Sequence, residues 1–339
     1  MNNQESVIHK KRDPVFDIMK GIAIFFVVMS HSNVAWLSSH TFATLRSPLF
    51  FIISGYFAKE WLLMNFIRNG AKRLLIPYVV TSLFMFPFVF LLSVFFPENN
   101  IIEIVVKSLF LGTSSFPNVG VVELSAGPLW FVAASIWVRT LWAVMIPIKR
   151  DVVKGIVILI LAIVAFKVKE HITLPFSLLS SFGALGFFFV GFCVRKYNLL
   201  NDLLRAKIFP ICLICFIYCI GYSNLDINYC IYGAGYIIDV AGALATFFIL
   251  FAVVERNANL DVRFWRILNF IGKYSIIAFC VHSIDHCLLV HWSPFKFWSY
   301  FQSNFEKVCV VTIRFGFVFV GTYFVTKSRF LKEKVFFVK

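Results

Sequence analysis

Long apolar stretches separated by short polar connections recur along nearly the whole chain. A transmembrane helix needs about 20 mainly apolar residues, and ten stretches meet or approach this length. We predict membrane-spanning helices over residues 20–37, 47–64, 75–96, 128–147, 153–168, 175–194, 207–223, 233–254, 270–292 and 308–326. The pattern therefore predicts an all-α polytopic membrane protein with about ten transmembrane helices. The chain would form one integral-membrane domain over residues 1–339, with short tails at 1–13 and 327–339.

Two further segments need separate interpretations. Residues 101–111 are apolar but charged and too short to span a bilayer, which favours an interfacial helix. The first apolar stretch follows the basic sequence His9-Lys10-Lys11-Arg12, like the start of a signal peptide. No small-residue cleavage site follows this stretch, and nine more apolar stretches come after it. We therefore expect it to stay uncleaved.

The composition agrees with a membrane protein. Hydrophobic residues make up 60% of the chain and charged residues only 14%, against about 25% charged in soluble domains. This excludes a soluble enzyme, a disordered chain and a secreted disulfide scaffold. The eight cysteines lie in or beside apolar stretches. Their apolar surroundings favour buried free thiols over disulfides, and over a zinc site at the helically spaced Cys212, Cys215 and Cys219.

The net charge of +15 comes from 32 Lys and Arg residues against 17 Asp and Glu. In a soluble protein it would suggest nucleic acid as a partner, but no exposed basic and aromatic stretch supports that. With the N-terminus inside, 24 of the basic residues fall in inner segments and 6 in outer ones. Because cytoplasmic loops accumulate Lys and Arg, we predict that both termini are cytoplasmic.

A few ionisable residues interrupt the apolar stretches. A charge at the bilayer centre costs about 2.5–3.5 kcal/mol on insertion scales, so such residues are functional candidates by default. We expect that they could converge on one buried polar cavity. They are His31, Arg139, Asp239, His282, Asp285, His286 and Arg314.

The first stretch carries a charged pair and a histidine. Lys20 and His31 are eleven residues apart, close to three helical turns, so they share a helix face about 16 Å apart. Asp17 lies near the same face. One interpretation is a polar path from the cytoplasmic boundary to a deep histidine. The alternative is a snorkelling lysine with a carboxylate partner and a histidine that bonds another helix.

The ninth stretch places His282 and His286 four residues apart, with Asp285 between them. Two histidines at this spacing can chelate zinc, but a third ligand would be needed and the sequence nominates none. We therefore favour a hydrogen-bonded polar patch near the outer interface and predict no metal.

The loop after the second stretch holds Arg68, Lys72 and Arg73. The positive-inside bias explains them, yet they are also the densest cytoplasmic cationic patch and would suit a phosphorylated donor. The chain has no Walker loop, GxGxxG or GxSxG, so ATP-driven transport and serine-hydrolase chemistry have no support. Glycines in the sixth stretch are expected to allow close helix packing. They are Gly183, Gly186 and Gly191.

Several strings occur in the order typical of one family. They are DIMKGIAIFFVVMSHS, SPLFFIISGYF (47–57), KRLLIPY (72–78), GPLWFV (127–132), LPFSLLSSFGALGFFFVGFCVRK (174–196) and IGKYSIIAFCVHSI (271–284). Together they cover nearly the whole chain, which resembles membrane acyltransferase family 3, particularly its fucose 4-O-acetylase-like branch. Lys20 stands where the family usually has an arginine, and Arg46-Ser47 stands where this branch often has Phe-His.

The resemblance implies an O-acyltransferase of the bacterial inner membrane. Such enzymes take an acyl group, usually acetyl from cytoplasmic acetyl-CoA, and esterify a hydroxyl of a cell-envelope glycan or glycolipid. Acetyl-CoA would be a co-substrate, with no tightly bound cofactor. The expected activity is therefore O-acetylation in polysaccharide modification.

The residues can be given roles in such a reaction. A positioned histidine contributes 10²–10⁴-fold as a general base, and His31 would deprotonate the acceptor hydroxyl. Asp17 and Lys20 would shape the cytoplasmic end of the path, while Arg68, Lys72 and Arg73 would hold the CoA phosphates. Direct transfer and a covalent acyl-histidine intermediate are both compatible with the sequence.

Further cavity candidates come from later stretches. Trp130 and Phe131 would pack against donor or acceptor, although an interfacial aromatic belt explains them equally well. The remaining cavity candidates are Arg139, Asp239, His282, Asp285 and Arg314.

Two other functions compete with the transferase. A glycan exporter or lipid-linked sugar translocase would suit ten helices and a polar cavity, although the paired broken helices of many transporters are not seen. A scaffold without chemistry would leave the intramembrane ionisable residues unexplained. Removal of His31 distinguishes the transferase from the exporter, because we expect transport to persist without it, whereas a transferase cannot lose its general base.

Overall fold

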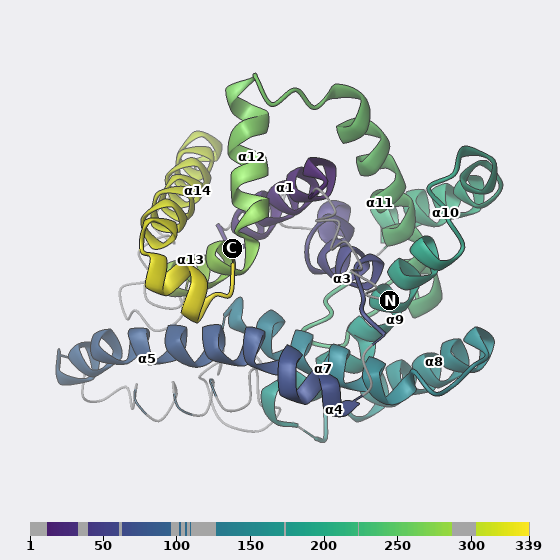
Figure 1. The fold of residues 1–339 in the computed structure, drawn as a ribbon, viewed down its shortest axis with the longest axis horizontal. Helices are drawn as coiled ribbons and strands as arrows, with labels where there is room; N and C mark the ends of the chain where they lie inside the picture. The colour runs from purple at the N-terminus through teal and green to yellow at the C-terminus, as the bar shows by residue number, and fades with distance from the viewer. Residues whose placement is uncertain are drawn as a thin grey trace, which may run out of the picture.

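The computed structural model describes residues 12–32, 40–60, 63–95, 102, 106, 109, 127–172, 174–222, 224–286 and 303–338. Within these residues the protein is helical throughout, apart from one isolated β-bridge between Asp226 and Ile231. The all-α prediction is therefore confirmed for this part of the chain (Figure 1).

Each predicted apolar stretch contains at least one helix. The elements are α1 (Pro14–Ser30), η1 (His40–Leu45), α3 (Ser47–Tyr56), α4 (Leu63–Phe66), η2 (Ile67–Ala71), α5 (Lys72–Phe95), α7 (Leu129–Met145), α8 (Asp151–Val168), η4 (Pro175–Ser177), α9 (Leu178–Lys196), α10 (Asp202–Tyr222), α11 (Tyr236–Asn257), α12 (Arg263–Lys273), α13 (Ser275–His286), α14 (Asn304–Lys327) and η7 (Leu331–Val335).

Four helical segments among the described residues are long and apolar enough to cross a membrane. They are Lys72–Phe95, Pro175–Lys196, Tyr236–Asn257 and Asn304–Lys327, and the bent pair of α12 and α13 would make a fifth. The count of ten spans and the cytoplasmic location of both termini stay predictions.

The helix expected over 20–37 begins at Pro14 and ends at Ser30, and most other bounds shift by a few residues. Two further predicted helices differ more. The helix expected over 47–64 ends at Tyr56. Its ten residues span about 15 Å, half the hydrocarbon thickness, and the exposed Lys59 and Glu60 follow it outside any helix. The helix expected over 270–292 is broken by an 87° bend between α12 and α13. The break lets α12 pack on α1 while α13 packs on α14. The segment 101–111 lies outside the described residues, except for 102, 106 and 109.

Glycines set the closest helix contacts. A Cβ atom on Gly272 of α12 would lie 1.6 Å from the Asp17 carbonyl oxygen of α1, and one on Gly191 of α9 would lie 1.9 Å from the Ile52 carbonyl oxygen of α3. Only a residue without a side chain permits these approaches, as expected for small residues between membrane helices. The packing role predicted for the glycines of α9 is confirmed at Gly191.

The other two glycines of that prediction also lie in close contacts. A Cβ atom on Gly183 or Gly186 would lie 2.1 Å from the hydroxyl of Tyr232 or Tyr236, respectively. A side chain at either position of α9 would therefore displace a tyrosine hydroxyl.

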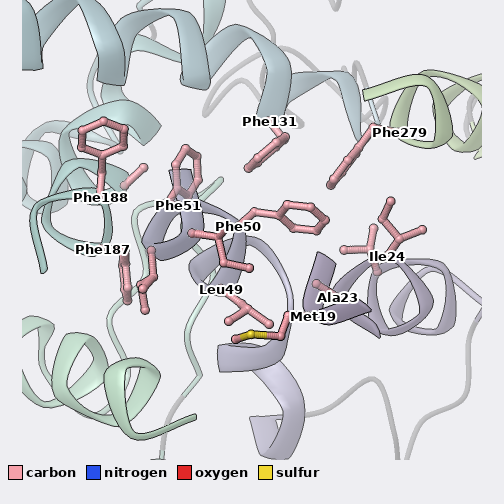
Figure 2. Packing of buried hydrophobic residues seen from close by; sticks show 14 of the residues in the cluster. Met19, Ala23, Ile24, Leu49, Phe50, Phe51, Phe131, Phe187, Phe188 and Phe279 are labelled. Atoms are coloured by element: carbon pink, nitrogen blue, oxygen red, sulfur yellow. The ribbon is translucent and has the colours of Figure 1, made fainter. Parts of the chain in front are cut away.

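A cluster of aromatic rings joins α3, α7 and α13 (Figure 2). The rings of Phe131 and Phe279 stack with centroids 4.6 Å apart, and Phe50 meets Phe279 edge-on at 4.9 Å. From α1, Met19 and Ile24 belong to the same core. These two residues lie between Asp17 and His31 in the sequence, so the core separates the two polar ends of α1, which runs near the middle of the bundle (Figure 1).

Candidate active site

Three histidine rings meet at the C-terminal end of α1. His31 is the C-cap residue of α1. Its ring centroid lies 4.3 Å from that of His286 and 5.5 Å from that of His282, both on α13. The two α13 rings are 5.9 Å apart, on successive turns of one helix face. We call these residues, together with Asp285 and Arg314, the histidine cluster.

An ion pair between α13 and α14 anchors the histidine cluster. Arg314 approaches one carboxylate oxygen of Asp285 with Nη2 at 2.6 Å and Nε at 2.8 Å. The side chains are buried, with exposed fractions of 0% for Arg314 and 3% for Asp285. Since a single buried charge is much costlier than a hydrogen-bonded pair, each residue requires the other in the folded protein.

Arg314 also holds the end of α1 and one histidine. Its Nη1 donates to the His31 carbonyl oxygen and, at 3.2 Å, to the Ser32 hydroxyl. Its Nη2 lies 3.4 Å from Nδ1 of His286. Because arginine can only donate hydrogen bonds, this contact favours a neutral His286 with its proton on Nε2. One guanidinium therefore fixes the backbone of His31 and the tautomer of its neighbour.

His282 is the buried imidazole with unused hydrogen-bonding capacity. It is 1% exposed, and neither ring nitrogen has a hydrogen-bond partner among the described residues. Its Nδ1 lies 3.6 Å from the Asp285 carboxylate, beyond normal hydrogen-bond length. A buried unsatisfied polar group costs about 1–3 kcal/mol. The ring is thus placed to gain from a polar group of a bound substrate.

A second polar group lies at the N-terminal end of α1. Asp13 caps the helix by accepting from the Val15 backbone N–H at 2.9 Å. Asp17 accepts from Lys20 at 2.8 Å and from Arg12 at 2.5 and 3.0 Å. The Asp17 carboxylate is therefore already neutralised by two cations.

A cavity of about 870 Å³ opens beside this end of α1. It follows one face of α7, where its lining residues recur every three or four positions: Phe131, Ser135, Arg139, Trp142 and Ala143. Two carboxylates, those of Asp13 and Asp17, line it with six cationic side chains. The six are Arg12, Lys20, Lys59, Arg73, Arg139 and Arg195. The cavity therefore has a strong excess of positive charge.

The aromatic ring cluster separates the cavity from the histidine cluster. Phe50, Phe131 and Phe279 line the cavity and pack against one another. On α13, Phe279 precedes His282 by three residues, or about 4.5 Å along the helix axis. A ligand that extends from the cationic side chains to these rings would therefore end about one helical turn from His282 along α13.

The structure brings several of the sequence-predicted residues together, in two places. His31, His282, Asp285 and Arg314 form the histidine cluster with His286. Asp17, Lys20, Arg73 and Arg139 line the cavity.

Three other candidates lie apart from both places. Asp239 is buried between α10 and α11, where the Cys219 thiol is 3.6 Å from its carboxylate. Trp130 is buried beside Phe131 with ring centroids 6.2 Å apart, but does not line the cavity. Lys72 is exposed and also absent from the lining. The Arg68 side chain lies outside the described residues. The seven intramembrane ionisable residues therefore do not all share one cavity. Five meet in the histidine cluster, Arg139 lines the cavity, and Asp239 lies between α10 and α11.

Sequence reasoning missed other contributors. Ser32, which accepts from Arg314, looks like an ordinary loop residue in sequence. Arg12 and Arg195 look in sequence like ordinary basic residues beside apolar stretches, although both line the cavity. Within the described residues, no group of three or more His, Cys, Asp or Glu side chains is arranged to hold a metal ion.

Comparison with models of protein families matches residues 13–327 to the family described as an acyltransferase domain. The chain belongs to this family. No curated protein and no solved structure matches it. Family membership and the apolar helices together make the protein an integral-membrane acyltransferase, with an acyl donor and an acceptor as substrates.

Proposed function

We propose that this acyltransferase is an O-acetyltransferase that moves acetyl from cytoplasmic acetyl-CoA to a hydroxyl of a cell-envelope glycan or lipid-linked sugar. It would act in a bacterial inner membrane, with ten spans and both termini in the cytoplasm, as a member of the fucose 4-O-acetylase-like branch. The observation that carries the proposal is the buried histidine cluster one helical turn beyond a cationic cavity, in a chain of the acyltransferase family.

The cavity suits a donor with charged and apolar parts. Six cationic side chains line the cavity, among them Lys20, Arg73 and Arg195, and they would neutralise phosphates. Phe131 and Phe279 also line it, and an uncharged arm would lie against these rings. A thioester at the tip of that arm would meet the histidine cluster after passing Phe279.

His31 acts as the general base in the proposed reaction. It takes the proton of the acceptor hydroxyl while the oxygen attacks the thioester carbonyl, so that a C–O bond forms and the C–S bond breaks. The leaving thiolate then takes the proton from His31, which restores the neutral imidazole. Arg314 supports this step, since it holds the His31 backbone and compensates the Asp285 charge.

The test measures release of free CoA by purified protein supplied with acetyl-CoA and a panel of glycan acceptors. His31→Ala should lower acceptor-dependent release by about 10²–10⁴-fold, with thermal unfolding showing intact folding. His171→Ala is the matched control, because His171 is exposed at the end of α8 and far from the cluster in the chain. Full activity of folded His31→Ala protein would refute the assignment of the base. No release by wild type with any acyl donor would favour the glycan exporter.

A further inference from the structure

Arg139 lies in the middle of the apolar helix α7 and has no counter-ion in the described part of the chain. It lies in α7, ten residues after Leu129 and six before Met145. Among the described residues it has no ion pair and no hydrogen bond, although it lines the cavity. In the span predicted over 128–147, an arginine costs about 2.5–3.5 kcal/mol on insertion scales and is normally paired or faces a polar cavity. An anion that enters the cavity would therefore compensate the charge of Arg139.

The neighbours of Arg139 add further positive charge to the cavity. Arg73, at the start of α5, lies close enough for the two positive charges to repel each other. Arg195, at the end of α9, has the face of Phe192 at 6.0 Å but no carboxylate partner among the described residues. The carboxylate of Asp17 is occupied by Arg12 and Lys20. Three guanidinium groups thus share one cavity whose nearest buried carboxylate is already paired.

We propose that Arg139, with Arg73 and Arg195, binds a phosphate group of the thioester donor inside the helix bundle. The inference rests on the proposed function for the identity of the donor. Guanidinium groups bind phosphate through paired N–H donors and lose less hydration than lysine does. The phosphate site thus lies at Arg139 in the cavity, whereas Lys72 of the sequence-predicted patch stays outside the lining.

The positions of Arg139 and Phe131 in the cavity support a donor whose phosphate lies at Arg139 and whose uncharged arm extends toward Phe279. Arg139 and Phe131 lie on one face of α7, eight residues or about 12 Å apart. A phosphate at Arg139 leaves this length of cavity for the uncharged arm, which would end beside Phe279 and the histidine cluster. The volume of about 870 Å³ lies in the range of sites that hold ligands of nucleotide size.

The experiment compares two donors that differ in phosphate alone. Acetyl-CoA and S-acetyl-pantetheine carry the same thioester and arm, but the second has no phosphate. Arg139→Gln should raise the KM for acetyl-CoA by about 10- to 100-fold, the loss expected for hydrogen bonds to a charged group. It should change the KM for S-acetyl-pantetheine by less than about twofold. Arg150→Gln is the matched control and should affect neither donor, because Arg150 is exposed and does not line the cavity.

Binding of CoA itself gives a readout that does not depend on turnover. CoA should raise the unfolding temperature of wild-type protein and of Arg150→Gln protein, and the shift should be lost in Arg139→Gln protein. Arg139→Lys keeps the charge without the paired donors and should give an intermediate shift, which also covers the case of a glutamine variant that does not fold.

The outcomes separate this inference from the proposed function. Equal CoA binding by wild-type and Arg139→Gln proteins would overturn the phosphate site even if acetyl transfer is observed. An equal rise of KM for acetyl-CoA and S-acetyl-pantetheine in Arg139→Gln protein would do the same. CoA binding that depends on Arg139 without transfer from any thioester would keep the site and refute the proposed function.

Discussion

The buried pair of Arg314 and Asp285 gives the sharpest prediction about stability. Replacing Arg314 by methionine leaves the Asp285 carboxylate, 3% exposed, without its cation. It also removes the hydrogen bonds to the His31 carbonyl and to Ser32. Replacing Asp285 by leucine leaves a guanidinium that is 0% exposed without a counter-ion.

The magnitudes follow from desolvation. Breaking a buried ion pair by removing one partner costs about 3–5 kcal/mol, since the remaining charge stays uncompensated. Replacing both partners by apolar residues of similar volume is often near neutral. We therefore expect each single variant to lose about 3–5 kcal/mol of unfolding free energy and the double variant Arg314→Met, Asp285→Leu to recover most of it. The double variant should stay inactive, because the His31 backbone and the three imidazoles lose their support.

The assay is a double-mutant cycle on protein in detergent, with unfolding free energies from denaturant titration. The surface pair Arg329 and Glu333 provides the comparison, with an N–O distance of 3.3 Å and an Arg329 side chain that is 89% exposed. Its cycle should give a coupling energy of about 0–1 kcal/mol. The reasoning would be refuted if each single variant at the buried pair lost less than about 1 kcal/mol of unfolding free energy. It would also be refuted if the loss in the double variant equalled the sum of the two single losses.

Two further predictions concern packing and pH. Gly272→Ala places a Cβ atom 1.6 Å from a backbone oxygen of α1, so it should lower the unfolding temperature. Gly316→Ala places its Cβ atom in open space and should be neutral or stabilising. Equal unfolding temperatures for the two variants would contradict the close contact at Gly272. Burial raises the pKa of Asp151, which precedes the predicted span 153–168, but hydrogen bonds from Lys196 and Tyr197 outweigh burial and leave this pKa below its ordinary value. A carboxyl whose pKa is lower in the folded state stabilises the fold above its unfolded pKa and loses that contribution as the pH falls through its folded pKa. Asp151→Asn should therefore be less stable than wild type at neutral pH, and this difference should shrink in acid; a difference that does not vary with pH would argue against the assigned hydrogen bonds.

The sequence by itself determined where the helices form, because apolar stretches in a chain with few charges must be buried in lipid or in protein. It also placed Lys20 and His31 on one face of the first helix, since that relation depends only on helical periodicity. The ionisable residues that matter were recognisable for the same reason, as charges are costly wherever the chain is apolar.

Only the tertiary structure decided which of these residues meet. Arg314 finds Asp285 because α14 packs on α13 across 29 residues of sequence, and no local pattern encodes that contact. Asp239 has the same burial and charge type as Asp285 but faces Cys219 on α10. Likewise, Arg73 lines the cavity and Lys72 does not, although the two cations are adjacent in the sequence. Periodicity fixes the face of one helix, whereas the neighbour of that face depends on packing between helices, on which the sequence carries only indirect information.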